Sequence, residues 1–99
     1  MAQVAPEHRP ARLVDKDLKN LLGFWRTVPE FATEWPEWDE DSRLDFIHEW
    51  PIERETLQRG ADMAAAGLLN ERQQCEWLEL TRLIEIHRDT VEQMLGEPI

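Results

Sequence analysis

Residues 70–95, NERQQCEWLELTRLIEIHRDTVEQML, decide the fold. Asn70 is a favoured N-cap residue, and Gln73 follows three positions later, which is the spacing of a capping box. Behind this cap, mostly apolar side chains recur within one sector of about 120° around a helix. The members of this stripe are Trp77, Leu80, Leu83, Ile84, His87, Val91, Met94 and Leu95. The pattern predicts one amphipathic helix over residues 71–95, about 37 Å long.

The length and the outer face of this helix raise the question of what covers it. A rod of that length exceeds the diameter of about 33 Å expected for a compact sphere of this size, so we expect an elongated bundle or a helix shared between two chains. Cys75, Leu78 and Ile86 fall outside the main stripe. Either the aromatic segment 29–40 or a second copy of the chain covers them, and both alternatives stay open. We expect Cys75 to be a half-buried, reduced thiol.

A further helix is predicted immediately before this one. Residues 52–66 and the following Leu68 carry small and apolar side chains at helical spacing, and Gly67 is a favoured residue at a helix C-terminus. The residues concerned are Leu57, Ala61, Ala64, Ala65 and Leu68. Because the connection to residue 71 is short, the two helices are expected to form an antiparallel hairpin. Pro51 removes a backbone donor and restricts Trp50, so the helix is expected to kink there, or to stop and restart at Pro51.

The N-terminal third carries another amphipathic pattern. From Pro10, a favoured first residue of a helix, apolar residues recur at helical spacing, and Pro29 is expected to end the helix. The stripe comprises Val14, Leu18, Leu21, Leu22, Trp25 and Val28, and the opposite side carries Arg12, Lys16, Lys19 and Arg26. We expect this basic side to neutralise the acidic segment 30–55, within the chain or across a dimer.

Residues 29–40, PEFATEWPEWDE, contain two prolines and no steady period, so they predict an ordered but irregular crossing. Asp41 or Ser42 is expected to cap the next helix, with Asp45 three residues after Ser42 as in a capping box. The buried side of that helix is predicted to comprise Leu44, Phe46, Ile47 and Trp50.

Three aromatic residues of the crossing, Phe31, Trp35 and Trp38, have no predicted helical face. Trp25 and Trp77 stand in register with apolar stripes and are expected in the core, as is Trp50. Tryptophan is also enriched where the binding energy of interfaces concentrates. The three crossing residues therefore either cover the helical core or contact a partner.

Composition indicates an acidic domain without a membrane span. The 99 residues suffice for one domain, assigned to residues 10–99 behind a flexible arm at residues 1–9. The formal net charge is −10, and residues 27–55 carry ten acidic and two basic side chains, a net of −8. Such a surface disfavours nucleic acid and anionic membranes and favours a basic protein surface. No apolar run approaches the roughly 18 residues of a membrane span, and no signal peptide is recognised, so we expect a cytoplasmic location.

No residue pattern predicts catalysis. His48 follows Asp45 by three residues and His87 follows Glu85 by two, whereas carboxylate-bridged bundle sites need Glu-x-x-His pairs on two helices and further inward carboxylates. Cys75, the single cysteine, lies among amide and acidic neighbours that do not stabilise a thiolate. We expect no catalytic residue, no metal ligand and no cofactor.

These observations predict an all-α fold of three or four helices, an elongated bundle with a long antiparallel hairpin at its C-terminus. The first functional hypothesis is a small non-enzymatic interaction or regulatory module that self-associates as a homodimer. The alternative is a neutraliser of a basic protein, such as an antitoxin, an immunity protein or a DNA-mimicking inhibitor, and a metal-dependent helical enzyme ranks third. The predicted partner-binding residues are Phe31, Trp35, Trp38, Leu78 and Ile86.

Overall fold

The structure, a computed structural model, describes residues 10–99. Its elements are α1 (Ala11–Glu34), a 3-10 turn η2 (Trp35–Glu37), α2 (Glu40–Ala65) and α3 (Glu71–Leu95). No strand occurs among the described residues, which confirms the predicted all-α class. The predicted flexible arm, residues 1–9, lies outside the described residues.

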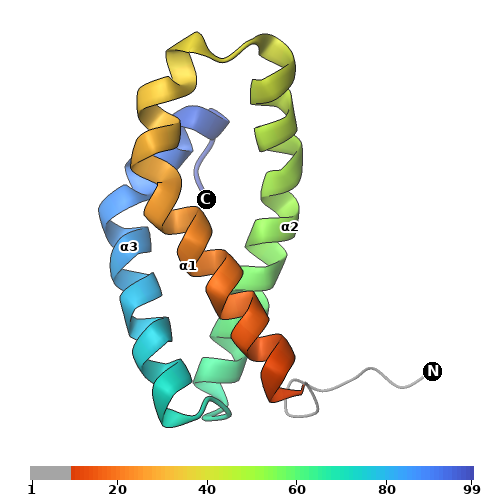
Figure 1. Ribbon diagram of the computed structural model, residues 1–99, viewed down its shortest axis with the longest axis vertical. Helices are drawn as coiled ribbons and strands as arrows, with labels where there is room; N and C mark the ends of the chain where they lie inside the picture. Colours follow the sequence, from red (N-terminus) through yellow and green to blue (C-terminus); the bar gives the residue numbers. More distant parts are fainter. Residues whose placement is uncertain (1–9) are drawn as a thin grey trace, which may run out of the picture.

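The three helices run up, down and up, and α1 crosses diagonally over the other two (Figure 1). Its contact with α3 is the most extensive in the bundle. The molecule extends 42 × 33 × 22 Å, with a radius of gyration of 14.8 Å against about 13 Å for an average compact chain of this length. The bundle is therefore elongated, as predicted.

The core is built around the apolar stripe of α1, whose six predicted members are all buried. Trp25 and Val28 are fully enclosed, and α3 contributes Leu80 and Val91 with no exposed surface. The remaining core residues are Trp50, Met63, Leu69 and Ile84. Trp77, predicted in the core, is half-buried and packs against its edge.

The boundaries of α3 follow its local sequence signals. Asn70 Oδ1 accepts a hydrogen bond from the Gln73 N–H at 2.8 Å, and Gln73 Oε1 accepts one from the Asn70 N–H at 3.0 Å. The predicted capping box is thus confirmed. Gly96 ends the helix with φ 77°, a conformation that costs glycine little.

The connection between α2 and α3 is a glycine-terminated turn. Gly67 has φ 71°, the Gly67 N–H donates to Ala64 O at 3.1 Å, and the Leu68 N–H donates to Met63 O at 3.0 Å. These bonds satisfy carbonyls that the end of α2 leaves free. The turn reverses the chain, so α2 and α3 form the predicted antiparallel hairpin (Figure 1).

Two prolines that were expected to interrupt helices lie inside them. Pro29 is within α1 and Pro51 within α2, so the predicted end of the first helix at Pro29 and the predicted stop and restart at Pro51 are wrong. Both prolines are solvent exposed, and each leaves the carbonyl four residues earlier, on Trp25 and on Ile47, without its helical donor. Buried packing next to each proline holds the helical backbone, with Trp25 and Val28 before Pro29 and Trp50 before Pro51.

The predicted crossing 29–40 is shorter than expected and α2 has a different cap. α1 continues to Glu34, η2 adds one turn, and Asp39 is the N-cap of α2. Asp39 Oδ1 accepts a hydrogen bond from the Ser42 N–H at 2.7 Å, so the expected caps Asp41 and Ser42 are wrong. An aspartate and a serine both favour caps, and the choice depends on where the preceding turn places the chain.

The expected buried side of this helix is correct in part. Phe46 and Trp50 are buried and Ile47 is half-buried, but Leu44 is 41% exposed. In the second half of α2, Met63 is buried although it lies outside the predicted stripe. The predicted member Ala65 is exposed.

Ion pairs connect α1 to α2 and α3, and the partners differ from those expected from the sequence. Arg26 of α1 pairs with Glu79 of α3, not with the acidic segment 30–55. Carboxylates of α1 also receive cations, because Arg72 binds Asp15 at 3.0 Å and Arg59 binds Asp17 at 3.3 Å. These pairs tie α1 to α2 and α3, so for Arg26 the expected neutralisation of segment 30–55 is wrong.

Candidate protein-binding surface

Five aromatic side chains meet where α1 turns into α2. This aromatic cluster consists of Phe24, Phe31, Trp35, Trp38 and Phe46. Phe46 is at its centre, with its ring centroid 5.5 to 6.2 Å from the centroids of the other four. Phe46 is buried, whereas the other four rings are half-buried. The cluster therefore continues the core outward to the surface.

Local sequence explains how three short segments supply these rings. Phe24 and Phe31 are seven residues apart on α1, so two helical turns place them on one side. The turn η2 carries Trp35, and the extended residue Trp38 follows it with ψ 140°. The cap at Asp39 then starts α2, about two turns before Phe46 reaches the cluster. The continuation of α1 past Pro29 to Glu34 therefore places Phe31 in the cluster.

One cation of the chain itself is bound to this cluster. The guanidinium of Arg43 lies over the Trp35 ring, 5.4 Å from its centroid. Its Nη2 and Nε also donate to Trp35 O at 2.8 and 3.1 Å. Cation–π attraction and two charge-assisted hydrogen bonds therefore hold η2 against α2.

A pocket of about 390 Å³ opens beside the cluster. Its lining residues are Phe24, Phe31, Trp38, Ser42, Asp45, Phe46 and Glu49. Four of these are aromatic, and the three others are polar residues of α2, all exposed. The pocket therefore combines apolar walls with a negatively charged rim, and we call it the aromatic pocket.

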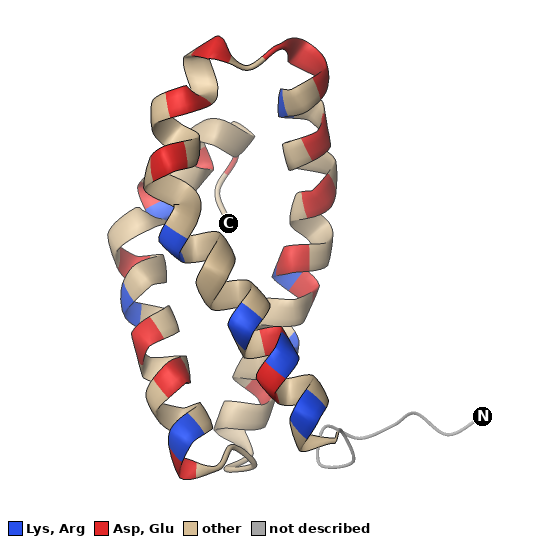
Figure 2. Cartoon of the chain, viewed as in Figure 1, with Lys and Arg blue, Asp and Glu red and all other residues tan. Residues whose placement is uncertain are grey.

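The surroundings of the cluster are strongly acidic. Figure 2 shows Asp and Glu concentrated at the turn between α1 and α2 and along the adjoining helices. We call this region, residues 30–53, the acidic end. Within residues 10–99, none of the observed ion pairs joins one of its carboxylates to a basic side chain. Its negative charge is therefore largely uncompensated within the described chain.

Two carboxyl groups of the acidic end have shifted pKa values in opposite directions. The hydrogen bond from the Ser42 N–H lowers the pKa of Asp39 below its usual value of 3.8. Burial, together with the nearby carboxylate of Glu49, raises the pKa of Glu53 above 4.5. Repulsion between Glu49 and Glu53 is a sign of the local excess of negative charge.

The five predicted partner-binding residues fall into two separate places. Phe31, Trp35 and Trp38 come together in the aromatic cluster. Leu78 and Ile86 lie on the outer face of α3, 62% and 70% exposed. The aromatic segment therefore does not cover them, and that alternative is wrong.

Three further outcomes concern single residues. Cys75 is an exposed thiol, so the expected half-burial is wrong. No other part of residues 10–99 covers this side of α3.

Phe24 and Phe46 belong to the cluster but were not predicted as site residues. The spacing of seven residues from Phe24 to the selected Phe31 is the signal that could have found Phe24.

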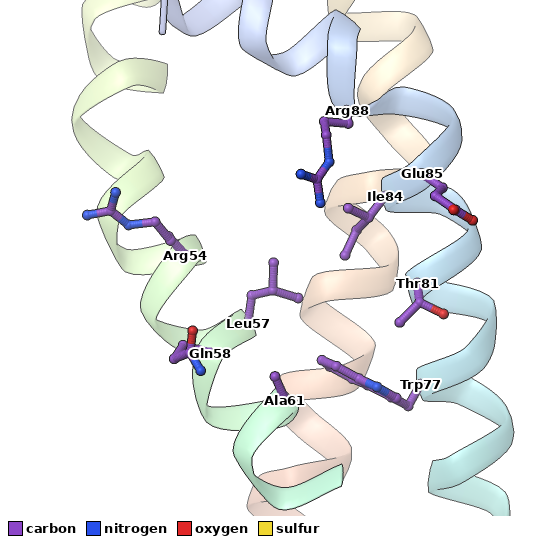
Figure 3. A pocket seen from close by; sticks show the side chains of 9 residues that line it. All are labelled: Arg54, Leu57, Gln58, Ala61, Trp77, Thr81, Ile84, Glu85 and Arg88. Atoms are coloured by element: carbon purple, nitrogen blue, oxygen red, sulfur yellow. The ribbon is translucent and has the colours of Figure 1, made fainter. Parts of the chain in front are cut away.

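A second hollow lies between α2 and α3, with a volume of about 510 Å³. Figure 3 shows Leu57, Trp77 and Ile84 directed toward one another across it. Its rim includes the cations Arg54 and Arg88. The hollow exists because the side chains of α2 and α3 meet only partly along the hairpin.

No group of three or more potential metal ligands gathers anywhere within residues 10–99. Over the same range, no helix combines the length and the apolar character needed to cross a membrane. Comparison of the chain with protein-family models, with curated proteins and with solved structures found no match in any of the three.

Proposed function

We propose that this chain is a small non-enzymatic protein-interaction module that binds a basic protein through its acidic end. The observation that carries the proposal is the aromatic cluster, whose half-buried rings lie within the most acidic part of the chain. Aromatic anchors within a polar rim are typical of protein-binding sites.

The exposure of the rings supports a binding role. Trp25 and Trp50, which belong to the core, are 0% and 4% exposed. Phe31, Trp35 and Trp38 pack against one another yet remain half-buried. A partner that covers them gains roughly 25 cal/mol for each Å² of apolar surface removed from water.

The charge of the acidic end supports a basic partner. Residues 27–55 have a net charge of −8, and Arg43, one of their two basic residues, already engages Trp35. A surface with this charge attracts cations over about a Debye length, which raises association rates with basic proteins and disfavours acidic ones. Binding of a basic partner is therefore favoured over self-association, which the sequence alone favours.

Affinity capture with matched variants tests this proposal. One variant carries Glu30→Gln, Glu34→Gln and Glu37→Gln at the acidic end, and its control carries Glu85→Gln, Asp89→Asn and Glu97→Gln on and after α3. All six residues are exposed, and both variants have the same net charge. We expect a basic protein from the source cell to be retained by the wild type and the control and lost from the acidic-end variant, with retention falling as salt rises. Equal retention by all three proteins would contradict the proposal.

Self-association is a second candidate, favoured by Leu78 and Ile86. They are eight residues apart on α3, share its outer face and are mostly exposed. Sedimentation of Leu78→Asp tests it, with Ile52→Asp as control because Ile52 is an equally exposed residue of α2, at 66%. If α3 forms a dimer interface, only Leu78→Asp should weaken the dimer, by at least tenfold. A wild-type chain that stays monomeric at millimolar concentration would exclude this candidate. No observation on residues 10–99 favours a metal-dependent enzyme.

A further inference from the structure

We infer that the aromatic pocket takes one arginine side chain of the basic partner. The inference rests on the proposed function and makes it specific, because it names the chemical group recognised and the residues that hold it. The occupant follows from the aromatic walls and the acidic rim of the pocket, and from the cation that the cluster already holds.

The walls of the pocket suit a flat cation. Phe24, Phe31, Trp38 and the buried Phe46 line it with aromatic rings. Aromatic faces carry partial negative charge, and a guanidinium stacks on them while keeping its N–H groups free at the edge. The volume of about 390 Å³ is at the lower end of the range for small-ligand sites.

The rim supplies acceptors for the N–H groups. Asp45 and Glu49 are four residues apart on α2, so they lie on one side of the helix, one turn from each other. Both side chains are exposed, and neither takes part in an observed ion pair within residues 10–99. Arginine binds carboxylates with two parallel hydrogen bonds, a geometry that lysine lacks.

A separate observation shows that this cluster binds a guanidinium. On the Trp35 side, Arg43 occupies the ring face 5.4 Å from its centroid and donates two hydrogen bonds to the Trp35 carbonyl. The pocket side offers the same ring chemistry and two carboxylates, but its lining residues include no basic side chain. Burial raises the pKa of Glu53, and the nearby Glu49 carboxylate raises it further. This repulsion agrees with an excess of negative charge beside the pocket.

Titration with short peptides tests the inference. The probes are hexa-arginine, hexa-lysine and hexa-glutamate, with binding measured by calorimetry at low salt. The variant carries Asp45→Asn and Glu49→Gln, and its control, with the same net charge, carries Asp89→Asn and Glu97→Gln. All four residues are exposed, so both variants are expected to fold, and circular dichroism checks this. Trp38→Leu probes the wall.

We expect the Kd for hexa-arginine to rise at least tenfold in the Asp45 and Glu49 variant and less than threefold in the control. The Trp38 indole N–H resonance should shift on titration of the wild type, Trp38→Leu should weaken binding, and hexa-lysine should bind more weakly than hexa-arginine. Equal loss of affinity in the variant and the control would overturn the pocket while leaving the proposed function standing. Equal affinity for the two basic peptides would overturn the choice of arginine. Absence of any binding to the basic peptides would overturn both proposals.

Discussion

Helix α3 packs against α1 closely and against α2 loosely, although α2 is its neighbour in sequence. Its contact with α1 is the most extensive in the bundle, and its fully buried Leu80 and Val91 belong to the same apolar core as the stripe of α1. Toward α2, the side chains leave the hollow of about 510 Å³. A short connection therefore makes two helices antiparallel but does not determine how closely they pack. The packing depends on the side chains on their facing sides.

The composition of the facing sides explains the difference. α1 offers six large apolar residues in register, and ion pairs at Asp15 and Arg26 reinforce its contact with α3. α2 offers half-buried Leu57, Ala61 and Ala64. Small residues allow close approach, but here the close contact is local: Gly60 meets the ring of Trp77.

Shortening a side chain at the α1–α3 interface should lower the unfolding free energy more than any other change considered. Leu80→Ala leaves a cavity at a position with no exposed surface, and such changes cost about 2 to 5 kcal/mol of unfolding free energy. Urea unfolding followed by circular dichroism measures this. A loss below about 1 kcal/mol would mean that the α1–α3 interface is not the main source of stability.

The same truncation at the loose interface should cost less. Leu57 is half-buried and lines the hollow between α2 and α3, so Leu57→Ala should lower the unfolding free energy by about 1 kcal/mol, roughly in proportion to the apolar area lost. Urea unfolding under identical conditions gives the ratio of the two effects. Equal costs for Leu57→Ala and Leu80→Ala would remove the distinction between the interfaces.

Two glycine substitutions sharpen the comparison. Gly23→Ala in α1 adds a methyl group that meets no atom within 4 Å, so higher helix propensity should stabilise the chain by about 0.5 to 1 kcal/mol. In Gly60→Ala the new Cβ would lie 2.7 Å from Trp77 Cζ3, and the ring must move. We expect no net gain there, with a shifted Trp77 indole N–H resonance. A gain equal to that of Gly23→Ala, without the shift, would contradict the contact.

The smallest effect is expected at Glu53 of α2, where burial and Glu49 raise the pKa of the carboxyl above 4.5. The folded state then binds the proton more tightly than the unfolded state, so this group's contribution to stability falls as pH rises from 4.5 through the raised pKa. Glu53→Gln should be slightly more stable than the wild type at pH 7 and equally stable at pH 3. Thermal unfolding at both pH values checks the sign, and Glu55→Gln, at an exposed neighbour, is the control.

Local signals in the sequence predicted the ends of α3 and its turn from α2, because Gly67, Asn70 and Gln73 act through neighbouring backbone groups. The two prolines were misjudged because the lost hydrogen bond is offset by packing with distant residues, which spacing alone does not reveal. The close contact of α1 with α3 was not predicted for the same reason.

The candidate site was predicted in part. Phe31, Trp35 and Trp38 were selected because no helical stripe accounted for them, and they do lie together. Phe46 was assigned to the core, which is correct for its burial, but its role as the centre of the cluster depends on the fold. The pocket combines side chains of both helices with a residue of their connection, so no single segment contains its pattern.

The exposed sulfur of Cys75 gives this chain a ready handle for spectroscopy. It lies near the start of α3, at the end of the molecule opposite the α1–α2 turn (Figure 1). A nitroxide attached there, without any engineered mutation, would report dipolar broadening if two α3 helices approach each other. The spectrum of the same label should not change when a partner binds at the acidic end. One labelled protein therefore distinguishes self-association through α3 from partner binding.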